Sequence, residues 1–207
     1  MGNSSSQRDA RGLREILVGL DRVAQHRAAV RWATANGRVI DMFGDFAKER
    51  HLLIFQSGNE CENWIDPIGN VLYKMNTLTH VGEDLLKLLN RIDVYNSLFP
   101  ETAMRLIGLQ VMSESMVFPV FSQPFVVNAR FATKDEIVDY MHARGFEPTG
   151  EDGKFSNGQL LLWDIKPKNV LIIFLFTSTF IFYLFYIISF YSVCFWKFYK
   201  GWNIEFC

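Results

Sequence analysis

The sequence predicts an α+β fold in which one antiparallel sheet of five strands packs against a helix, with a partial second lobe after it. Apolar runs alternate with turn signals between residues 51 and 127, which indicates strands joined by tight connections. Residues 79–96 instead carry apolar side chains at helical spacing. A chain of 207 residues can bury a substantial core, and its net charge of −1 argues against nucleic acid as a partner.

The composition divides the chain into four segments. Residues 1–50 form a helical N-terminal segment, because apolar side chains recur there every three or four positions. The first lobe is expected over residues 51–127 and the partial second lobe over residues 128–172. Residues 173–207 are a hydrophobic tail. The three cysteines are far apart and show no metal-ligand spacing, so neither a zinc site nor a disulfide framework is expected.

The first three strands of the sheet are predicted at residues 51–55, 61–65 and 71–75. Gly58 lies in the first turn, where the lack of a side chain would let the backbone approach a ligand closely. Lys74 lies within the third strand, where neither strand propensity nor burial favours lysine. Two interpretations of this lysine stay open: an exposed residue on an edge strand, or a cation that binds phosphate.

The predicted helix over residues 79–96 begins with two acids, Glu83 and Asp84, which the helix dipole favours at that end. Two further apolar runs, at residues 104–112 and 117–127, are expected to complete the sheet as a hairpin. Another helix should begin after Thr133, because Thr133 and Glu136 have the spacing of a capping box, and end at Gly145.

A short polar motif, D-x-K-P-x-N, follows the apolar run at residues 160–162. It contains Asp164, Lys166 and Asn169. Phosphoryl transfer from a nucleotide needs these residue types: a carboxylate for the proton of the attacking hydroxyl, a cation near the moving phosphoryl group and an amide oxygen for Mg²⁺. The alternative interpretation is a surface turn built around Pro167.

The motif resembles the catalytic loop of protein kinases, H-R-D-x-K-P-x-N, although Leu162 and Trp163 replace the His-Arg pair. The order of a glycine turn, a strand lysine, an acidic helix and this motif is also similar to that of kinases. More narrowly, the chain looks like the compact serine/threonine/tyrosine kinase-like domains of polyvalent proteins from bacterial phages and mobile elements. Four stretches carry this resemblance, which covers residues 56–172: V-L-Y-K-M-N, Y-N-S-L-F-P-E, S-Q-P-F-V and A-T-K-D-E-I.

The resemblance implies a kinase-like small lobe, an incomplete large lobe, ATP and Mg²⁺ as cofactors, and a protein substrate of unknown identity. Asp164 would be the catalytic base and Lys166 would act near the phosphoryl group, with Asn169 as the Mg²⁺ ligand. We expect Lys74 and Asp164 to face one cleft.

The nucleotide would be bound by residues of the first lobe. The resemblance implies that Gly58 and Lys74 contact its phosphates and that Glu83 pairs with the lysine, with Asp84 as second choice for that pair. Gln123 and Phe125 would lie at the connection that receives the adenine.

One departure from the kinase pattern is large. A kinase needs a second metal-binding aspartate beyond its catalytic loop, and no aspartate follows Asp164. Residues 170–196 are instead uncharged and long enough for one transmembrane helix, or they are the product of a frameshift or truncation. Two functions stay open: an incomplete or inactive ATP-dependent protein kinase, and a non-catalytic nucleotide-binding or interaction module tethered to a membrane. Without an authentic span, a cytoplasmic location is expected.

Overall fold

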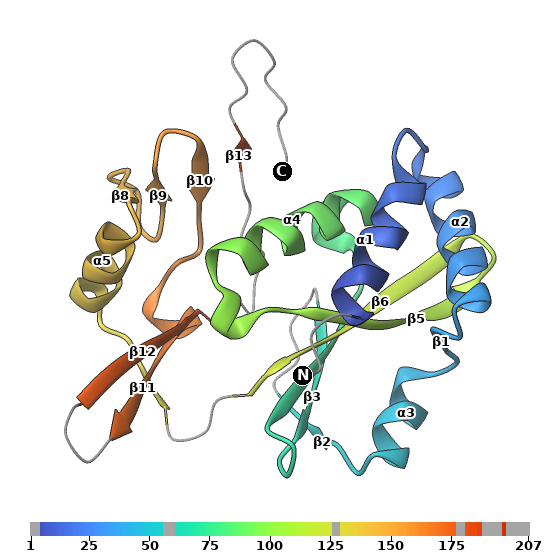
Figure 1. Cartoon of the computed structure of the whole chain (residues 1–207), viewed down its shortest axis with the longest axis horizontal. Coiled ribbons are helices and arrows are strands. Elements are labelled where there is room, and N and C mark those ends of the chain that lie inside the picture. Colours follow the sequence, from blue (N-terminus) through green and yellow to red (C-terminus); the bar gives the residue numbers. More distant parts are fainter. Residues whose placement is uncertain (1–4, 56–60, 126–128, 177–180, 188–195, 198–207) are drawn as a thin grey trace. The chain divides into compact units, whose positions relative to one another are not determined.

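The computed structural model describes backbone in residues 5–55, 61–125, 129–176, 181–187 and 196–197. The chain divides into two compact units, which are described separately (Figure 1). The first unit contains residues 1–96 and 103–125, and the second contains residues 97–102 and 126–207.

The first unit is built on a six-stranded sheet with the order β1-β5-β6-β4-β3-β2. The strands β2 to β6 are the five that the sequence predicted, and all of their pairings are antiparallel. The count of five was wrong by one strand, because β1 from the N-terminal segment joins the sheet parallel to β5. The strand bounds are β1 Val39–Ile40, β2 Leu53–Ile54, β3 Cys61–Asp66, β4 Val71–Asn76, β5 Arg105–Ser113 and β6 Met116–Pro124.

A glycine in β5 explains why β1 can join the sheet. A Cβ atom at Gly108 would lie 2.6 Å from the carbonyl oxygen of Arg38, which is closer than real Cβ contacts. The neighbouring Leu109 N–H donates a 2.8 Å hydrogen bond to the same oxygen. Only a residue without a side chain lets the two backbones approach this closely.

Two layers of helix cover the sheet of the first unit. On the face that carries Phe121, the leucines of α4 form a core with residues of α1 and α2. On the other face, Phe43 of α3 packs against Met75 and Val120. The helix bounds are α1 Ser5–Leu17, α2 Arg22–Ala35, α3 Phe43–Glu49 and α4 Leu85–Leu98.

The predicted helix over residues 79–96 is broken near its start. A 3₁₀ turn covers Thr79–Val81, and α4 begins only at Leu85. Gly82 and Glu83 lie between them with φ angles of 63° and 62°, which a right-handed helix cannot contain. The Asp84 carboxylate then accepts a 2.8 Å hydrogen bond from the N–H of Lys87, as an N-cap residue does.

Two buried side chains of α2 connect this helix to the start of α4. Gln25 accepts a 3.0 Å hydrogen bond from the N–H of Leu86. The ring of His26 accepts a 3.1 Å hydrogen bond at Nδ1 from the N–H of Val117, so its Nε2 carries the proton and donates to the carbonyl oxygen of Glu83 at 3.0 Å. The N-terminal segment is therefore part of the first unit.

Replacing His26 with leucine should lower the free energy of unfolding by about 1–3 kcal/mol, because the buried N–H of Val117 loses its acceptor. Urea unfolding followed by circular dichroism measures the loss. The matched control is His142→Leu, at a half-exposed histidine whose partner is the exposed Glu147, where a change below about 1 kcal/mol is expected. Equal effects of the two substitutions would contradict the buried role of His26.

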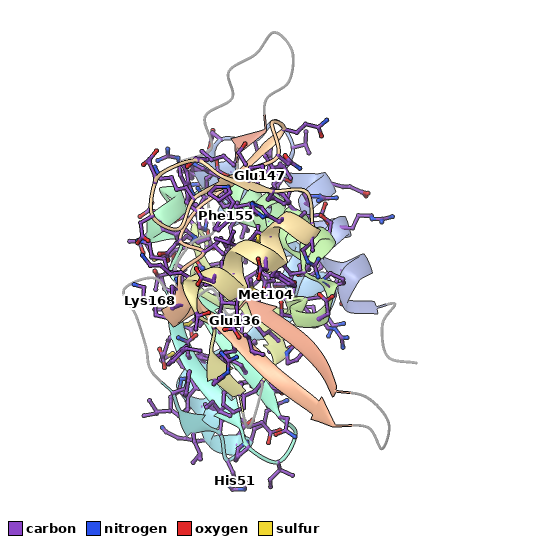
Figure 2. The ribbon with its side chains drawn as sticks, turned by 90° about the vertical axis from the view of Figure 1, so that its left-hand side faces the viewer. His51, Met104, Glu136, Glu147, Phe155 and Lys168 are labelled. Atoms are coloured by element: carbon purple, nitrogen blue, oxygen red, sulfur yellow. The ribbon has the colours of Figure 1, made fainter. Side chains whose placement is uncertain are left out.

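The second unit consists of α5 and two small sheets. One sheet has the order β13-β10-β9-β8 and the other the order β12-β11-β7. A 3₁₀ turn, Pro167–Asn169, precedes β11. Phe155 of β9 is buried, whereas Lys168 is exposed (Figure 2). The bounds are α5 Lys134–Ala143, β7 Ala129–Phe131, β8 Glu147–Pro148, β9 Phe155–Ser156, β10 Leu160–Leu162, β11 Val170–Phe176, β12 Ile181–Ile187 and β13 Trp196–Lys197.

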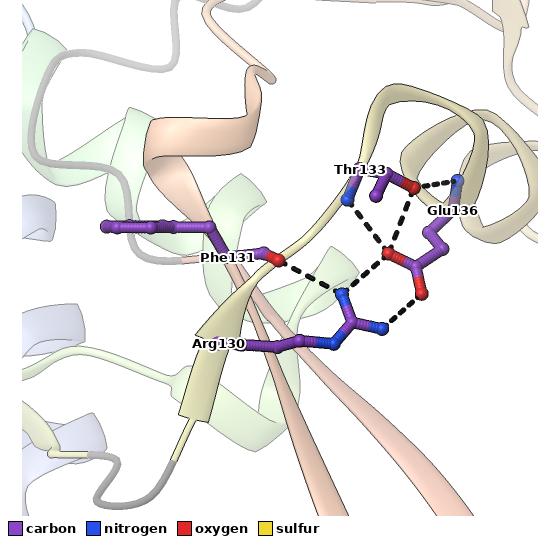
Figure 3. Close-up of polar contacts among 4 residues, drawn as sticks. All are labelled: Arg130, Phe131, Thr133 and Glu136. Carbon is purple, nitrogen blue, oxygen red and sulfur yellow. Dashed lines mark hydrogen bonds and ion pairs between the residues drawn. The ribbon is translucent and has the colours of Figure 1, made fainter.

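The start of α5 is held by the predicted capping box (Figure 3). Thr133 and Glu136 bond each other's backbone, and Glu136 also accepts two hydrogen bonds from the guanidinium of Arg130 in β7. The Arg130 guanidinium, followed by the Thr133 N–H, holds the pKa of Glu136 down at about 2. Beyond β7, the N–H of Ala132 donates to the carbonyl oxygen of Val170, which connects the segment before α5 to the start of β11.

The helix expected over the hydrophobic tail is not what the described residues form. Residues of β11 and β12 pair as an antiparallel hairpin, and β11 also pairs with β7. Val170 and Ile172 are buried, and the isoleucine, phenylalanine and tyrosine of these strands favour β structure. Among the described residues, no helix combines the length and the apolar content needed to cross a membrane.

Candidate functional site

The D-x-K-P-x-N motif forms a closed loop between β10 and β11. The side-chain amide of Asn169 donates to the carbonyl oxygen of Asp164 at 2.8 Å and to its carboxylate oxygen Oδ2 at 2.9 Å. The N–H of Lys166 donates to the same Asp164 carbonyl at 3.0 Å, and the N–H of Asn169 donates to the carbonyl oxygen of Lys166 at 2.8 Å. The structure therefore brings the three predicted residues of the second lobe together.

Two features distinguish this loop from an ordinary surface turn around Pro167. Asn169 is only 1% exposed, so its amide is a structural part of the loop. Asp164 has a φ angle of 62°, in the left-handed region that non-glycine residues seldom adopt and that is common at functional sites. Together the hydrogen bonds and this conformation fix the direction of the Asp164 carboxylate.

The loop offers ligands for Mg²⁺ but not a complete metal site. Because Asn169 uses its amide nitrogen toward Asp164, its Oδ1 atom is the one that could bind a cation. Within the described ranges, no group of three or more His, Cys, Asp or Glu side chains could hold a metal by itself.

Lys74 lies in β4 between β3 and β6, where it faces Asn63 on one side and Phe121 on the other. Its side chain is only 4% exposed, so the interpretation as an exposed lysine on an edge strand is wrong. Burial lowers the pKa of Lys74 to about 8, and the nearby Cys61 raises it slightly against that effect. The residue is therefore a buried lysine in a central strand of the sheet.

Gln123 lies on the same face of the sheet as Lys74, opposite Leu72. Its side chain is 3% exposed, and neither its amide oxygen nor its amide nitrogen has a hydrogen-bond partner among the described residues. Burying such an amide without partners costs about 1–3 kcal/mol, which a polar ligand would recover. Gln123 therefore fits a ligand-binding role through its side chain, at the connection where the resemblance places the adenine.

The structure gives contacts for two other predicted nucleotide-binding residues, Phe125 and Glu83. Phe125 lies just after β6, its N–H donates to the carbonyl oxygen of Asn70 at 2.8 Å, and its ring lies 5.7 Å from that of Phe55. Glu83 is exposed ahead of α4, and its carbonyl oxygen bonds His26. The expected pair of Glu83 with Lys74 is not among the ion pairs described, and it stays a prediction.

Gly58 lies outside the described residues. Lys74 and Gln123 belong to the first unit, whereas Asp164 and Asn169 belong to the second, so their common cleft also stays a prediction. Sequence reasoning missed Asn63, a buried amide directly opposite Lys74. The alternation of β3 could have indicated it, since Asn63 occupies the same face as its apolar neighbour Ile65.

Comparison with known proteins gives one match. Residues 23–188 match the family described as Serine/Threonine/Tyrosine Kinase found in polyvalent proteins. This region includes α2 from its second residue onward and the hairpin of β11 and β12, so the family domain begins earlier and ends later than the expected residues 56–172. No curated protein and no solved structure matches the chain. Because the match covers more than half of the chain, this protein belongs to the family of serine/threonine/tyrosine kinases found in polyvalent proteins.

Proposed function

We propose that this domain binds ATP with Mg²⁺ and slowly transfers the terminal phosphoryl group to a hydroxyl group of a protein. The observation that carries the proposal is the pair of hydrogen bonds from Asn169 to Asp164, which orients a carboxylate in a loop that also contains Lys166. Positioning and charge compensation are the main needs of phosphoryl transfer, and both depend on such fixed groups.

Each side chain has a distinct role in this proposal. Asp164 orients the attacking hydroxyl and accepts its proton, and Lys166 compensates negative charge on the moving phosphoryl group. Asn169 offers Oδ1 to Mg²⁺, which, when bound, neutralises charge on the nucleotide phosphates. Lys74 serves the phosphates of the same nucleotide, because an ammonium group forms charge-assisted hydrogen bonds with phosphate oxygens.

The buried amide of Gln123 supports the adenine-binding part of the proposal. An amide presents one acceptor and two donors, and the base edge of adenine presents a donor and an acceptor side by side. A base bound here would satisfy both polar atoms of Gln123, which have no partners among the described residues.

The slow rate is proposed because residues 165–196, where a kinase would place its second metal-binding aspartate, contain none. The same observation favours a second candidate, a non-catalytic nucleotide-binding or interaction module. Membrane attachment through the uncharged residues 170–196 is part of that second candidate, and it would require β11 to separate from β7. Sedimentation of the tagged chain with membranes, resistant to alkaline washing, would support the attachment.

The test combines binding and transfer. The purified full chain is incubated with labelled ATP and Mg²⁺, alone and with a mixed protein acceptor, while calorimetry measures ATP binding under the same conditions. Binding with slow labelling of protein supports the kinase proposal. Binding without labelling supports the non-catalytic nucleotide-binding module. Absence of binding contradicts the kinase and the nucleotide-binding module and leaves the interaction module.

A further inference from the structure

The turn that joins β8 to β9 touches the catalytic loop. It is a closed turn, in which the N–H of Thr149 donates to the carbonyl oxygen of Lys154 and the N–H of Lys154 donates to that of Glu151, both at 3.1 Å. Gly150 and Gly153 have φ angles of 89° and 74°, which glycine adopts without strain. These hydrogen bonds hold the conformation of the turn. Residues 152 and 153 of the turn contact the catalytic loop.

Gly153 contacts the catalytic loop at two places, the backbone of Ile165 and the side-chain stem of Lys166. Its carbonyl oxygen accepts a 3.0 Å hydrogen bond from the N–H of Ile165. A Cβ atom on Gly153 would lie 2.7 Å from Cγ and 2.9 Å from Cε of Lys166, so the lysine stem runs directly over this glycine. Any side chain at position 153 would have to displace the lysine.

Asp152 supports the charged end of the same lysine. Its carboxylate lies between two ammonium groups: Oδ1 is 2.9 Å from Nζ of Lys134, and Oδ2 is 3.6 Å from Nζ of Lys166. The closer contact anchors Asp152 to α5. The longer contact exceeds a normal charge-assisted hydrogen bond, so Lys166 is attracted in one direction without being tightly bound.

We propose that Asp152 and Gly153 are positioning residues for Lys166, which hold its ammonium group in the direction needed to meet a phosphoryl group. This inference rests on the proposed role of Lys166 in transfer. A fully bonded Lys166 would have to break an ion pair before it could act, whereas an unguided lysine would sample many rotamers. The contact of Lys166 with Asp152 lies between these extremes, because the Asp152 carboxylate is closer to the ammonium group of Lys134 than to that of Lys166.

The first test replaces Asp152 with asparagine, which keeps the shape and removes the charge. We expect single-turnover phosphoryl transfer to fall roughly tenfold with the affinity for ATP unchanged, because misdirected catalytic groups lower the rate rather than the binding. The ¹⁵N NMR resonance of the Lys166 ammonium should shift, and Asp152→Glu should restore part of the rate. The matched control is Glu151→Gln on the same turn, since Glu151 pairs with Lys154 instead.

The second test uses the two glycines of the turn. Gly153→Ala should shift the Lys166 resonance and slow transfer, whereas Gly150→Ala should do neither, because a Cβ atom at Gly150 has no atom within 4 Å. Both substitutions place a side chain at a positive φ angle, so the difference between them reports mainly the contact with Lys166.

The outcomes separate this inference from the proposed function. If the Lys166 resonance is unchanged in both Asp152→Asn and Gly153→Ala, the positioning role is overturned, whatever the rate of transfer. If the resonance shifts in both variants while the unmodified chain transfers no phosphate, the positioning of Lys166 stands and the proposed kinase activity fails.

Discussion

Replacing Asp164 with asparagine is expected to reduce phosphoryl transfer by about 10²–10⁴-fold, the usual contribution of a positioned general base. Asparagine can still accept the hydrogen bond from Asn169, so the loop should keep its conformation. Only the ability to take a proton is lost. The measurement is the single-turnover rate with labelled ATP at saturating Mg²⁺, together with the dissociation constant for ATP, which should not change.

The matched control for this substitution is Asp139→Asn, at an exposed acid of α5. It changes the net charge by the same amount and should leave the rate unaltered. An Asp164→Asn protein that transfers phosphate as fast as the unmodified chain would exclude Asp164 as the base.

Replacing Lys74 with methionine is expected to stabilise the chain without ligand by about 3 kcal/mol at neutral pH. The pKa of Lys74 is about 8 in the folded state and 10.5 as a model value, and each pKa unit corresponds to about 1.4 kcal/mol. Below pH 8 both states bind the proton, and the folded state bears the net cost that the lowered pKa of Lys74 expresses. Between pH 8 and 10.5 mainly the unfolded state binds it, so the stability of the unmodified chain rises with pH in this window.

Urea unfolding at pH 7.5 and pH 10 measures this effect in both proteins. The unmodified chain should gain stability relative to Lys74→Met as the pH rises, and the difference between the two should shrink toward zero. Burial raises the pKa of Tyr140 to about 12, but that group is present in both proteins and cancels in the comparison. A constant difference between the two pH values would show that Lys74 does not carry a desolvated charge.

The strands and the catalytic loop could be predicted from the sequence because their signals are local. The alternation of apolar residues places Lys74 within a strand, and the spacing from Asp164 to Asn169 fits a single loop closed by one amide. The capping box of Thr133 and Glu136 is another local signal, and the structure contains it as predicted.

The remaining features depend on contacts between distant parts of the chain. β1 pairs with β5 because Gly108 admits the carbonyl of Arg38, a fit that neither segment shows alone. An apolar run such as residues 170–176 is compatible with helix or strand, and pairing with β7 decides between them. The break before α4 arises because Gly82 and Glu83 adopt positive φ angles, and it moves Glu83 out of the helix.

The candidate site also combines residues that have a local sequence signal with residues that only the fold brings together. Sequence spacing identified Asp164, Lys166 and Asn169, but Asp152 and Gly153 belong to a turn more than ten positions earlier, and only the folded chain reveals their contacts with Lys166. Their types, an acid and a glycine in a polar turn, are typical of any exposed connection.

The measurement that tests the central claim most directly is the calorimetric affinity for ATP with Mg²⁺ in the unmodified chain, in Lys74→Met and in Asn169→Ala. One substitution removes the proposed phosphate ligand of the first unit, and the other removes the proposed metal ligand of the second. If both side chains serve one nucleotide, each substitution should weaken binding roughly tenfold or more, since a charge-assisted contact contributes about 1.5–3 kcal/mol. Absence of ATP binding by the unmodified chain, or unchanged affinity in both variants, would contradict the account.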